Sequence, residues 1–200
     1  MPDNDKENRE EKKGRVMGFK FIETAIPGVK IIEPEIFGDA RGYFMESYRQ
    51  NAFAAAGIDC TFVQDNESCS KRGVLRGLHF QITHPQAKLV RVISGEIYDV
   101  AVDIRKDSPT RGQYVGVTLS SENKRQFFIP RGFAHGFLVL SDLAVFAYKC
   151  DEFYHTEDEG GYRYDDPAFA IQWPDPGVPV LLSEKDRNRD FISNRLKAVG

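Results

Sequence analysis

A histidine in the RGLHFQ segment at positions 76–81 is the first candidate for chemistry in this 200-residue chain. If the segment is a strand, alternation places His79 and Gln81 on one face together with Gly77. We expect Gly77 to leave room for a ligand beside His79 if that face lines a barrel. Histidine titrates near neutral pH and suits a general base. A lone histidine is more often satisfied by hydrogen bonds in a core, and position alone does not decide between these roles.

A second histidine follows a turn-forming sequence. The PRGFAH sequence at 130–135 has the PxGxxH spacing typical of cupins, small double-stranded β-barrels in which Pro and Gly form the turn that points the histidine inward. Metal-binding cupins also supply an HxH sequence followed by a glutamate, which completes a nitrogen and oxygen ligand set. This chain has four histidines and no HxH, and His84 and His155 lie in polar loop contexts. We therefore predict a cupin without a required metal.

Two further residues have a structural explanation as well as a chemical one. Tyr148 lies near the end of an expected strand, where a tyrosine usually packs with its hydroxyl at the surface. The sequence LSEKD at 182–186 is typical of a helix start, with Ser183 as N-cap and Asp186 in the capping-box position. Either residue could act in catalysis, but neither pattern alone requires it.

Short alternating runs separated by Gly, Pro, Asn and Asp follow one another from Phe19 onward, which is typical of a β-sandwich or barrel. Between Ile97 and Ile104, apolar residues alternate with Asp99 and Asp103, which predicts a half-buried strand. We expect one helix at about 48–56 that ends at Gly57, and a second from Ser183 towards Ala198. The expected strands include 89–93, 97–104, 114–119, 126–129, 136–140 and 145–150.

Residues 1–15 hold five basic and five acidic side chains and no aliphatic side chain beyond the initial methionine. Such a segment cannot bury enough apolar surface to offset the entropy lost on ordering. We predict a disordered charged tail over residues 1–16 and a single folded domain over 17–200, which includes the C-terminal helix.

Composition excludes several classes of protein. Lys plus Arg is 27 against 30 for Asp plus Glu, a net charge of -3, whereas a general nucleic-acid binder shows a basic excess. The three cysteines form no CxxC pair, which argues against a disulfide framework or zinc site and fits a reducing compartment. No apolar run approaches the ~18 residues of a membrane span, and the chain begins with charged residues rather than an apolar signal. We expect a soluble, cytoplasmic protein.

Seven sequence blocks, in order and at nearly constant spacing, resemble the dTDP-4-dehydrorhamnose 3,5-epimerase family. The resemblance covers about Lys20 to Arg187 and implies a mainly β, cupin-type double-stranded β-helix (jelly-roll barrel) with a few short helices. The blocks are FGDARG at 37–42, FVQDN at 62–66, GVLRGLHFQ at 73–81, KLVR at 88–91, DVAVDIR at 99–105, PRGFAHGF at 130–137 and FAYK at 146–149.

The resemblance implies epimerisation of dTDP-4-keto-6-deoxy-D-glucose at C3 and C5 to dTDP-4-keto-L-rhamnose, in deoxysugar biosynthesis. Both carbons flank the C4 ketone, so a base, an acid on the opposite face and a donor at O4 suffice, without metal or other cofactor. By the same resemblance His79 is the base and Asp186 fixes its tautomer. Tyr148 is the acid, and Lys88 lies near the ketone oxygen.

The resemblance also implies a homodimer, in which some nucleotide contacts come from the partner subunit. We expect a local cluster of cations to meet the dianionic substrate, with Arg41, Arg76, Lys88 and Lys185 as candidates. A tyrosine at the Tyr154 position influences how completely C5 is processed in the family. The implied substrate-binding residues are Arg41, Phe44, Glu46, Gln64, Asn66, Arg76, His135, Tyr154, Glu159 and Lys185.

Other functions fit part of the pattern. Relatives that share the motifs include epimerases that invert only C3 and enzymes for other nucleotide-linked 4-keto sugars. A metal-dependent cupin needs at least three convergent ligands. A non-catalytic sugar-nucleotide-binding cupin would keep Arg76 but lack the base or the acid, and this chain has candidates for both.

Overall fold

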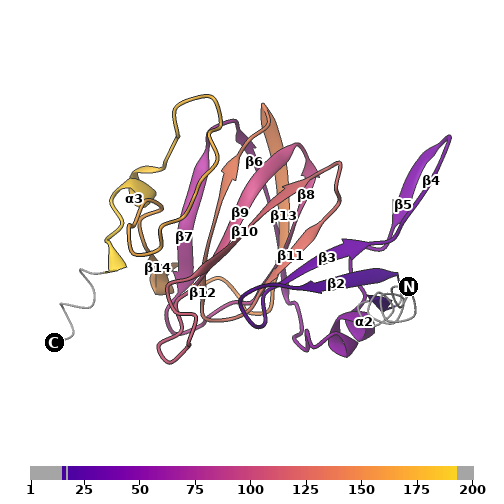
Figure 1. Cartoon of the computed structure of the whole chain (residues 1–200), viewed down its shortest axis with the longest axis horizontal. Helices are drawn as coiled ribbons and strands as arrows, with labels where there is room; N and C mark the ends of the chain where they lie inside the picture. Colours follow the sequence, from indigo (N-terminus) through magenta and orange to yellow (C-terminus); the bar gives the residue numbers. More distant parts are fainter. Residues whose placement is uncertain (1–14, 17, 193–200) are drawn as a thin grey trace, which may run out of the picture.

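Two antiparallel sheets form the body of the computed structural model, which describes residues 15–16 and 18–192 (Figure 1). The seven-stranded sheet has the order β1 (Arg15–Val16), β2 (Phe19–Glu23), β3 (Lys30–Pro34), β11 (Gln126–Ile129), β8 (Lys88–Ser94), β13 (Leu143–Cys150) and β6 (Gln64–Lys71). The five-stranded sheet has the order β10 (Tyr114–Ser120), β9 (Glu96–Asp103), β12 (Phe133–Val139), β7 (Leu75–Gln81) and β14 (Glu159–Gly161). The predicted mainly β barrel is confirmed, as are the six expected strands.

The main core lies between the two sheets. Phe127 and Phe146 of the larger sheet pack against Leu119 and Phe137 of the smaller one, and the rings of Phe137 and Phe146 lie 4.4 Å apart between centroids. All four side chains are buried. Burial of each stabilises the fold by about 1.5–3 kcal/mol, which makes the space between the sheets a packed interior.

A short helix covers part of the outer face of the seven-stranded sheet. Helix α2 (Gln50–Ala55) presents Phe53, which is fully buried against Ile32, Leu89 and the ring of Phe19. The helix expected at about 48–56 is confirmed, but it begins at Gln50, two residues later than predicted. Gly57 ends it as expected, at a positive φ of 82° that suits glycine.

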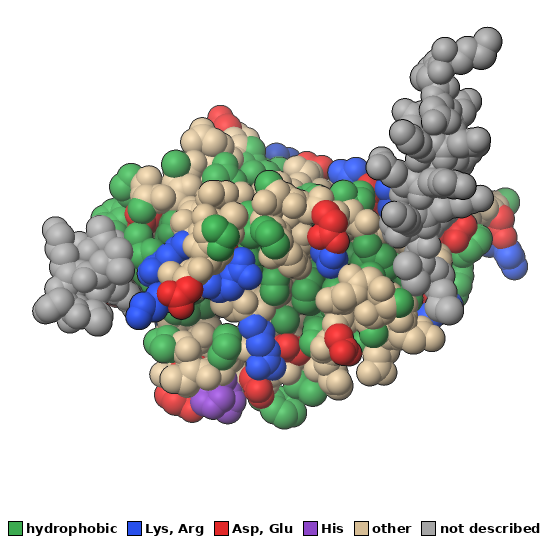
Figure 2. All heavy atoms as spheres, turned by 60° about the horizontal axis from the view of Figure 1, so that its bottom comes forward, with side chains coloured by type: hydrophobic (Ala, Val, Ile, Leu, Met, Phe, Trp, Pro, Cys, Tyr) green, Lys and Arg blue, Asp and Glu red, His purple; other side chains and the backbone are tan. Residues whose placement is uncertain are grey.

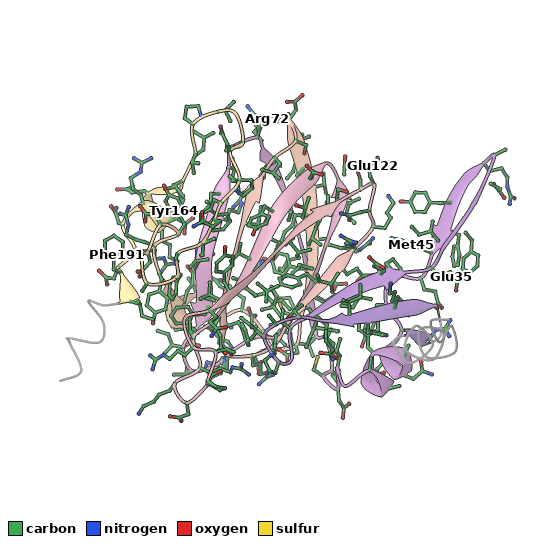
Figure 3. All side chains as sticks on the ribbon, viewed as in Figure 1. Glu35, Met45, Arg72, Glu122, Tyr164 and Phe191 are labelled. Atoms are coloured by element: carbon green, nitrogen blue, oxygen red, sulfur yellow. The ribbon has the colours of Figure 1, made fainter. Side chains whose placement is uncertain are left out.

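The C-terminal part of the chain covers the outer face of the five-stranded sheet. Leu78 and Val100 of that sheet pack beneath Phe169, with Trp173 beside them. Figure 3 shows Tyr164 in this covering layer, on the side of the body opposite the β4–β5 hairpin (Ile36–Asp39 and Gly42–Met45).

The prediction that β9 is only half buried is wrong. Asp99 and Asp103 are both 0% exposed, and the alternate residues Val100 and Val102 are buried as well. The alternation is real, but both faces are covered: one by the barrel interior and the other by the C-terminal layer. The carboxylate of Asp103 is satisfied by Arg105 and neighbouring hydroxyls of its own loop.

The predicted C-terminal helix is also corrected. Ser183 is its N-cap as expected, but α3 (Glu184–Arg187) spans one turn, and residues 193–200 lie outside the described part of the chain. Tertiary contacts compete for the next backbone groups: Arg163 donates to the carbonyl of Arg187, and Asp166 accepts from the amide of Ile192. A single 3-10 turn, η1 (Thr156–Asp158), precedes β14.

The boundary of the predicted tail shifts as well. Arg15 and Val16 form strand β1, which pairs with Lys20 and Phe19 of β2, so backbone pairing extends into the segment expected to be disordered. The rest of that predicted tail, residues 1–14, lies outside the described residues.

Surface charges of both signs are interspersed on the face shown in Figure 2, without a large basic patch. Among the described residues, no helix is both long enough and apolar enough to span a membrane.

We predict that Phe53→Ala lowers the free energy of unfolding by about 3–5 kcal/mol, because it removes a fully buried ring between α2 and the sheet. Urea unfolding at fixed protein concentration measures the loss. Val178→Ala is the control, since Val178 is 41% exposed, and it should change stability by less than about 0.5 kcal/mol. Equal losses in the two variants would contradict this packing.

Candidate functional site

His79 and Asp186 meet from segments far apart in sequence. Strand β7 carries His79, and α3 carries Asp186, whose Oδ1 contacts Nε2 of the histidine. The Ser183 hydroxyl accepts from the Asp186 amide at 3.0 Å and donates to Oδ2 at 2.8 Å. One aspartate therefore completes the helix cap and also holds the imidazole. Within the described residues, no hydrogen bond engages Nδ1 of His79, which leaves that nitrogen to exchange a proton.

The protonation state of this pair follows from its surroundings. Asp186 is 3% exposed, and burial alone would raise the pKa of its carboxyl. The hydrogen bond and charge of His79, together with the Ser183 hydroxyl, lower that pKa below its usual range instead. The Asp186 carboxylate is thus ionised at neutral pH.

A cleft of about 370 Å³ opens beside the pair. It brings together five residues that the sequence singles out, and all of them carry charge or can acquire it. Arg76 enters from β7, where its guanidinium also donates to the Ser70 hydroxyl at 3.1 Å. The five predicted residues that line the cleft are Arg76, His79, Glu159, Lys185 and Asp186.

The expected role of Gly77 is wrong. A Cβ atom at this position would lie 2.5 Å from Cα of Gly136 and 2.7 Å from the carbonyl oxygen of His135. The backbone of β12, rather than a ligand, fills the space that the glycine leaves. This close approach puts His79 of β7 directly opposite His135 of β12 in the sheet register.

A second histidine–aspartate pair lies deeper in the barrel. Nε2 of His135 is 3.0 Å from Oδ1 of Asp99, and both side chains are buried. Burial raises the pKa of Asp99 and lowers that of His135, and each shift is opposed by the charge of the other group. Asp99 was not predicted as a site residue from the sequence. The sequence signal that could have found Asp99 is an acidic residue among the apolar neighbours of a strand.

Tyr148 and Lys88 lie on adjacent strands of the seven-stranded sheet. Nζ of Lys88 is 5.8 Å from the centroid of the Tyr148 ring. Burial lowers the pKa of Lys88 and raises that of Tyr148, while the charge of Arg76 pulls the pKa of the tyrosine down in part. The Tyr148 phenol is therefore protonated at neutral pH and has a proton to donate.

Glu159 gathers three partners at the edge of the cleft. It accepts from the Tyr154 hydroxyl, from Lys185 at 2.8 Å and from Arg189. Burial would raise the pKa of Glu159, but the hydrogen bonds from Lys185 and Tyr154 lower it to about 2. The same contact with Glu159 raises the pKa of Tyr154 to about 12. Arg189 was missed because it belongs to no motif.

Gln64 and Asn66 of β6 lie beside Tyr154 and Tyr148, respectively. Gln64 donates to the Asn66 side chain at 2.9 Å and accepts from the Tyr154 amide at 3.0 Å. Asn66 lies opposite Tyr148 in the register of β6 and β13. Two of the predicted binding residues thus flank the strand that carries the tyrosine.

Three predicted binding residues lie away from the cleft of their own chain. Arg41 and Phe44 are on the β4–β5 hairpin, which projects from the body, and Glu46 follows it (Figure 1). The Phe44 side chain is 66% exposed, and Arg41 pairs with Asp39. Of the four expected cations, only Arg76 and Lys185 line the cleft, whereas Lys88 lies in the barrel.

Possible metal ligands are sparse around these groups. Among the residues that the structure describes, no three His, Cys, Asp or Glu side chains are placed to hold a metal ion together.

Known proteins resemble this chain over most of its length. The family model described as dTDP-4-dehydrorhamnose 3,5-epimerase matches residues 23–194. The enzyme of that name from Methanothermobacter thermautotrophicus is 58% identical over 85% of this chain and 92% of its own. The one from Pseudomonas aeruginosa is 57% identical over 84% and 93%.

Solved structures agree with the sequence comparison. A Legionella pneumophila dTDP-6-deoxy-D-glucose-3,5-epimerase, in complex with dTDP-4-keto-L-rhamnose, superposes with a TM-score of 0.85 at 55% identity, over 88% of this chain and 93% of that one. ChmJ from Streptomyces bikiniensis, a 3'-monoepimerase in complex with dTDP-quinovose, has a TM-score of 0.82 at 34% identity over 88% and 90%.

We predict that the stabilising effect of Glu159 is lost in acid. Its pKa falls from 4.5 to about 2 on folding, so its contribution is complete above pH 4.5 and declines as the pH drops towards 2. The difference in free energy of unfolding between the unchanged chain and Glu159→Gln should therefore be larger at pH 6 than at pH 3. Urea unfolding at both pH values measures it, and a difference independent of pH would contradict the ionised cluster.

Proposed function

The chain belongs to the dTDP-4-dehydrorhamnose 3,5-epimerase family, and we propose that it converts dTDP-4-keto-6-deoxy-D-glucose to dTDP-4-keto-L-rhamnose by inverting C3 and C5. The observation that carries this proposal is the His79–Asp186 pair at the cleft, with one ring nitrogen of the histidine left unengaged within the described residues. It is an isomerase, so substrate and product have the same composition.

The chemistry needs a proton removed from one face of the sugar and a proton returned on the other. When a C–H bond next to the C4 ketone breaks, its electron pair forms the enolate, with negative charge on O4. Reprotonation of the same carbon from the opposite face restores the ketone with inverted configuration. No electrons are gained or lost, and the sequence of events repeats at the second carbon.

The residues of the site suit these steps. We assign Nδ1 of His79 as the base, since Asp186 holds the other nitrogen and stabilises the imidazolium that forms. Tyr148, whose pKa is raised by burial, is the acid. Lys88 lies next to that ring, where its ammonium can stabilise the charge that develops on O4.

The binding residues divide between the sugar and the nucleotide. We assign Arg76 and Lys185 to the diphosphate, because both line the cleft and a guanidinium suits charge-assisted bonds to phosphate. His135 lies opposite His79 and is assigned to the sugar. Gln64, Asn66, Tyr154 and Glu159 are assigned to the same ligand from β6 and from the segment after β13.

We also propose that the chain acts as a homodimer in the cytoplasm. A two-stranded hairpin alone is marginally stable in water, and the β4–β5 hairpin exposes large apolar side chains. A second copy that covers them would bring Arg41, Phe44 and Glu46 of this chain to the nucleotide side of the cleft of that second copy. The exposed apolar residues of the hairpin are Ile36, Phe37, Tyr43 and Phe44.

The proposed activity predicts that the purified chain incorporates deuterium from D₂O at both C3 and C5 of dTDP-4-keto-6-deoxy-D-glucose, without added metal or nicotinamide. Mass spectrometry and NMR of the recovered sugar measure the incorporation. Deuterium at C3 alone would assign the chain to the epimerases that invert one carbon, and no incorporation at either carbon would overturn the epimerase proposal.

The same assay tests the base. His79→Ala should lower the exchange rate by roughly 10²–10⁴-fold, the usual contribution of a positioned general base, with an unchanged cooperative unfolding transition. A folded His79→Ala variant that exchanges at the normal rate would remove His79 from this role.

We predict that the hairpin is needed for dimer formation. Replacement of Phe37 and Phe44 together by serine removes two exposed rings, which are 58% and 66% accessible in the single chain. Sedimentation velocity should show the unchanged chain as a dimer and the variant shifted towards monomer. Val180→Ser, which also alters an exposed apolar side chain, is the control. A variant as dimeric as the unchanged chain would contradict the placement.

A further inference from the structure

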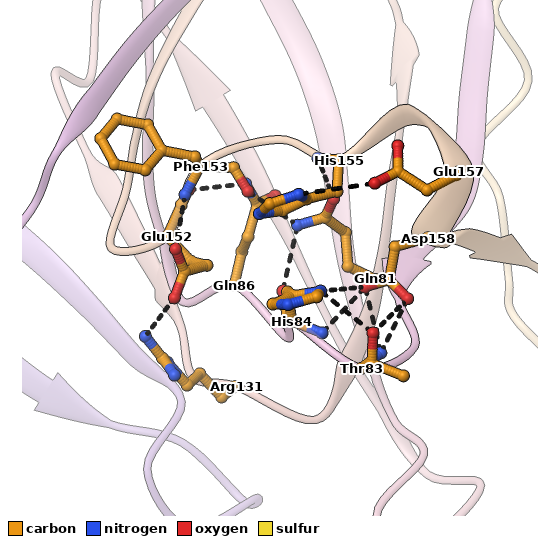
Figure 4. A network of polar contacts seen from close by, with 10 residues as sticks. All are labelled: Gln81, Thr83, His84, Gln86, Arg131, Glu152, Phe153, His155, Glu157 and Asp158. Carbon is orange, nitrogen blue, oxygen red and sulfur yellow. Dashed lines mark hydrogen bonds and ion pairs between the residues drawn. The ribbon is translucent and has the colours of Figure 1, made fainter.

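Gln81 lies two positions after His79 on β7, and its side chain amide is directed at the backbone of neighbouring loops (Figure 4). It is 6% exposed, so its polar atoms must find partners inside the protein. Nε2 donates to the carbonyl of Phe153 at 3.1 Å, and Oε1 accepts from the amide of His155 at 2.6 Å. The two bonds bracket Tyr154.

The orientation of this amide is determined by its third partner. Nε2 also donates to the carbonyl of His84 at 3.0 Å. A flipped amide would set Oε1 against the carbonyl oxygens of Phe153 and His84 and Nε2 against the amide of His155, so all three bonds would be lost. Gln81 therefore ties the loop after β7 to the segment after β13 in a single arrangement.

The loop after β7 is itself held firmly, which makes it a rigid anchor. The Asp158 carboxylate accepts from the amides of Thr83 and His84 and from the Thr83 hydroxyl. The rings of His84 and His155 stack with their centroids 4.2 Å apart. Figure 4 shows these contacts gathered around the side chain of Gln81.

Tyr154 depends on such backbone bonds because packing does little to hold it. Tyr154 is an exposed residue, with a relative accessibility of 47%. Apart from the bracket by Gln81, its amide donates to Gln64 and its hydroxyl to Glu159, a residue that lines the cleft. The polar bonds on either side of the residue thus decide where the phenol lies relative to the cleft.

We propose that Gln81 is a positioning residue, which holds the phenol of Tyr154 at the edge of the cleft by bonding the peptide groups on either side of it. The inference rests on the proposed function in one respect, the assignment of Tyr154 to the substrate. The strand that carries the base would then also set the position of this tyrosine.

A double-mutant cycle tests the proposal. Gln81→Met keeps the length of the side chain and removes the three bonds. It should slow deuterium exchange into the keto sugar by roughly tenfold to 100-fold, the range expected when a substrate-positioning group is displaced. In a Tyr154→Ala background the same substitution should have little further effect, because Gln81 acts through the tyrosine. Multiplicative losses would overturn the proposal.

Gln86→Met is the matched control. Gln86 belongs to the same loop and also donates to loop backbone, at the carbonyl of Glu152, but it does not bracket Tyr154. It should leave the exchange rate within about twofold of the unchanged chain, well below the loss in Gln81→Met. An equal loss in both variants would show a general effect on the loop and overturn the proposal.

A further variant covers the case in which Gln81→Met does not fold. Gln81→Glu keeps the acceptor for the His155 amide and loses both donated bonds when ionised. Its deficit in exchange rate, relative to the unchanged chain at the same pH, should shrink as the pH is lowered and the carboxyl regains a donor. A deficit that does not change with pH would overturn the proposal.

Failure of the proposed function is separable from failure of this inference. If the unchanged chain shows no exchange, the affinity for dTDP, measured by calorimetric titration, replaces the exchange rate in the double-mutant cycle. Non-additive losses of affinity in Gln81→Met and Tyr154→Ala would support the positioning role without the epimerase activity. Additive losses, or none in Gln81→Met, would overturn it.

Discussion

Strand β7 lies between β12 and the short edge strand β14 in the five-stranded sheet, and the C-terminal segment that contacts it assembles the candidate site. The amide of Leu78 donates to the carbonyl of Tyr162 at 3.1 Å, and Tyr162 returns a bond at 3.0 Å. Leu181 exchanges further hydrogen bonds with residues at the start of the strand. Because these contacts hold the segment on both sides, α3 begins close to β7, and Asp186 reaches His79 across 107 positions of sequence. His79 is therefore held by Asp186 only when this segment is docked.

Burial of charge is the second constraint on the interior. An ionised group moved out of water costs free energy unless it is paired. Asp99 meets this requirement through His135, and the contact holds the His135 ring in a defined position. Lys88 forms no ion pair with any described residue at a distance of 4.0 Å or less. Its amine is therefore not committed to a carboxylate of the described residues, and burial lowers its pKa.

The sequence predicts the local structure well and the long-range structure poorly. Alternation located β9 and β13, and the N-cap at Ser183 was visible in the LSEKD segment. The burial of Asp99 was not visible, because the barrel interior that encloses it is built from strands distant in sequence, such as β12, which carries His135. Helix α3 stops early for the same reason: tertiary partners take its next backbone groups.

The candidate site shows the same division. Motif resemblance selected His79 and Lys185, which the structure brings to one cleft, and it selected Arg41, which lies on a hairpin outside that cleft. In the proposed dimer Arg41 would serve the cleft of the second copy, an arrangement that pattern within one chain cannot show. Arg189 contacts Glu159 through geometry that no short motif encodes.

The placement of the site on β7 has a mechanical consequence. Along a strand, residues are separated by ~3.3 Å each and cannot slide relative to one another. Arg76, His79 and Gln81 therefore hold fixed spacings, although the first is the proposed phosphate anchor, the second is the proposed base and the third ties down the segment with Tyr154. If loops carried these three residues, the distances between them could vary independently. A paired strand couples them, so that the proposed base and the proposed phosphate anchor keep a separation that is set before a substrate binds.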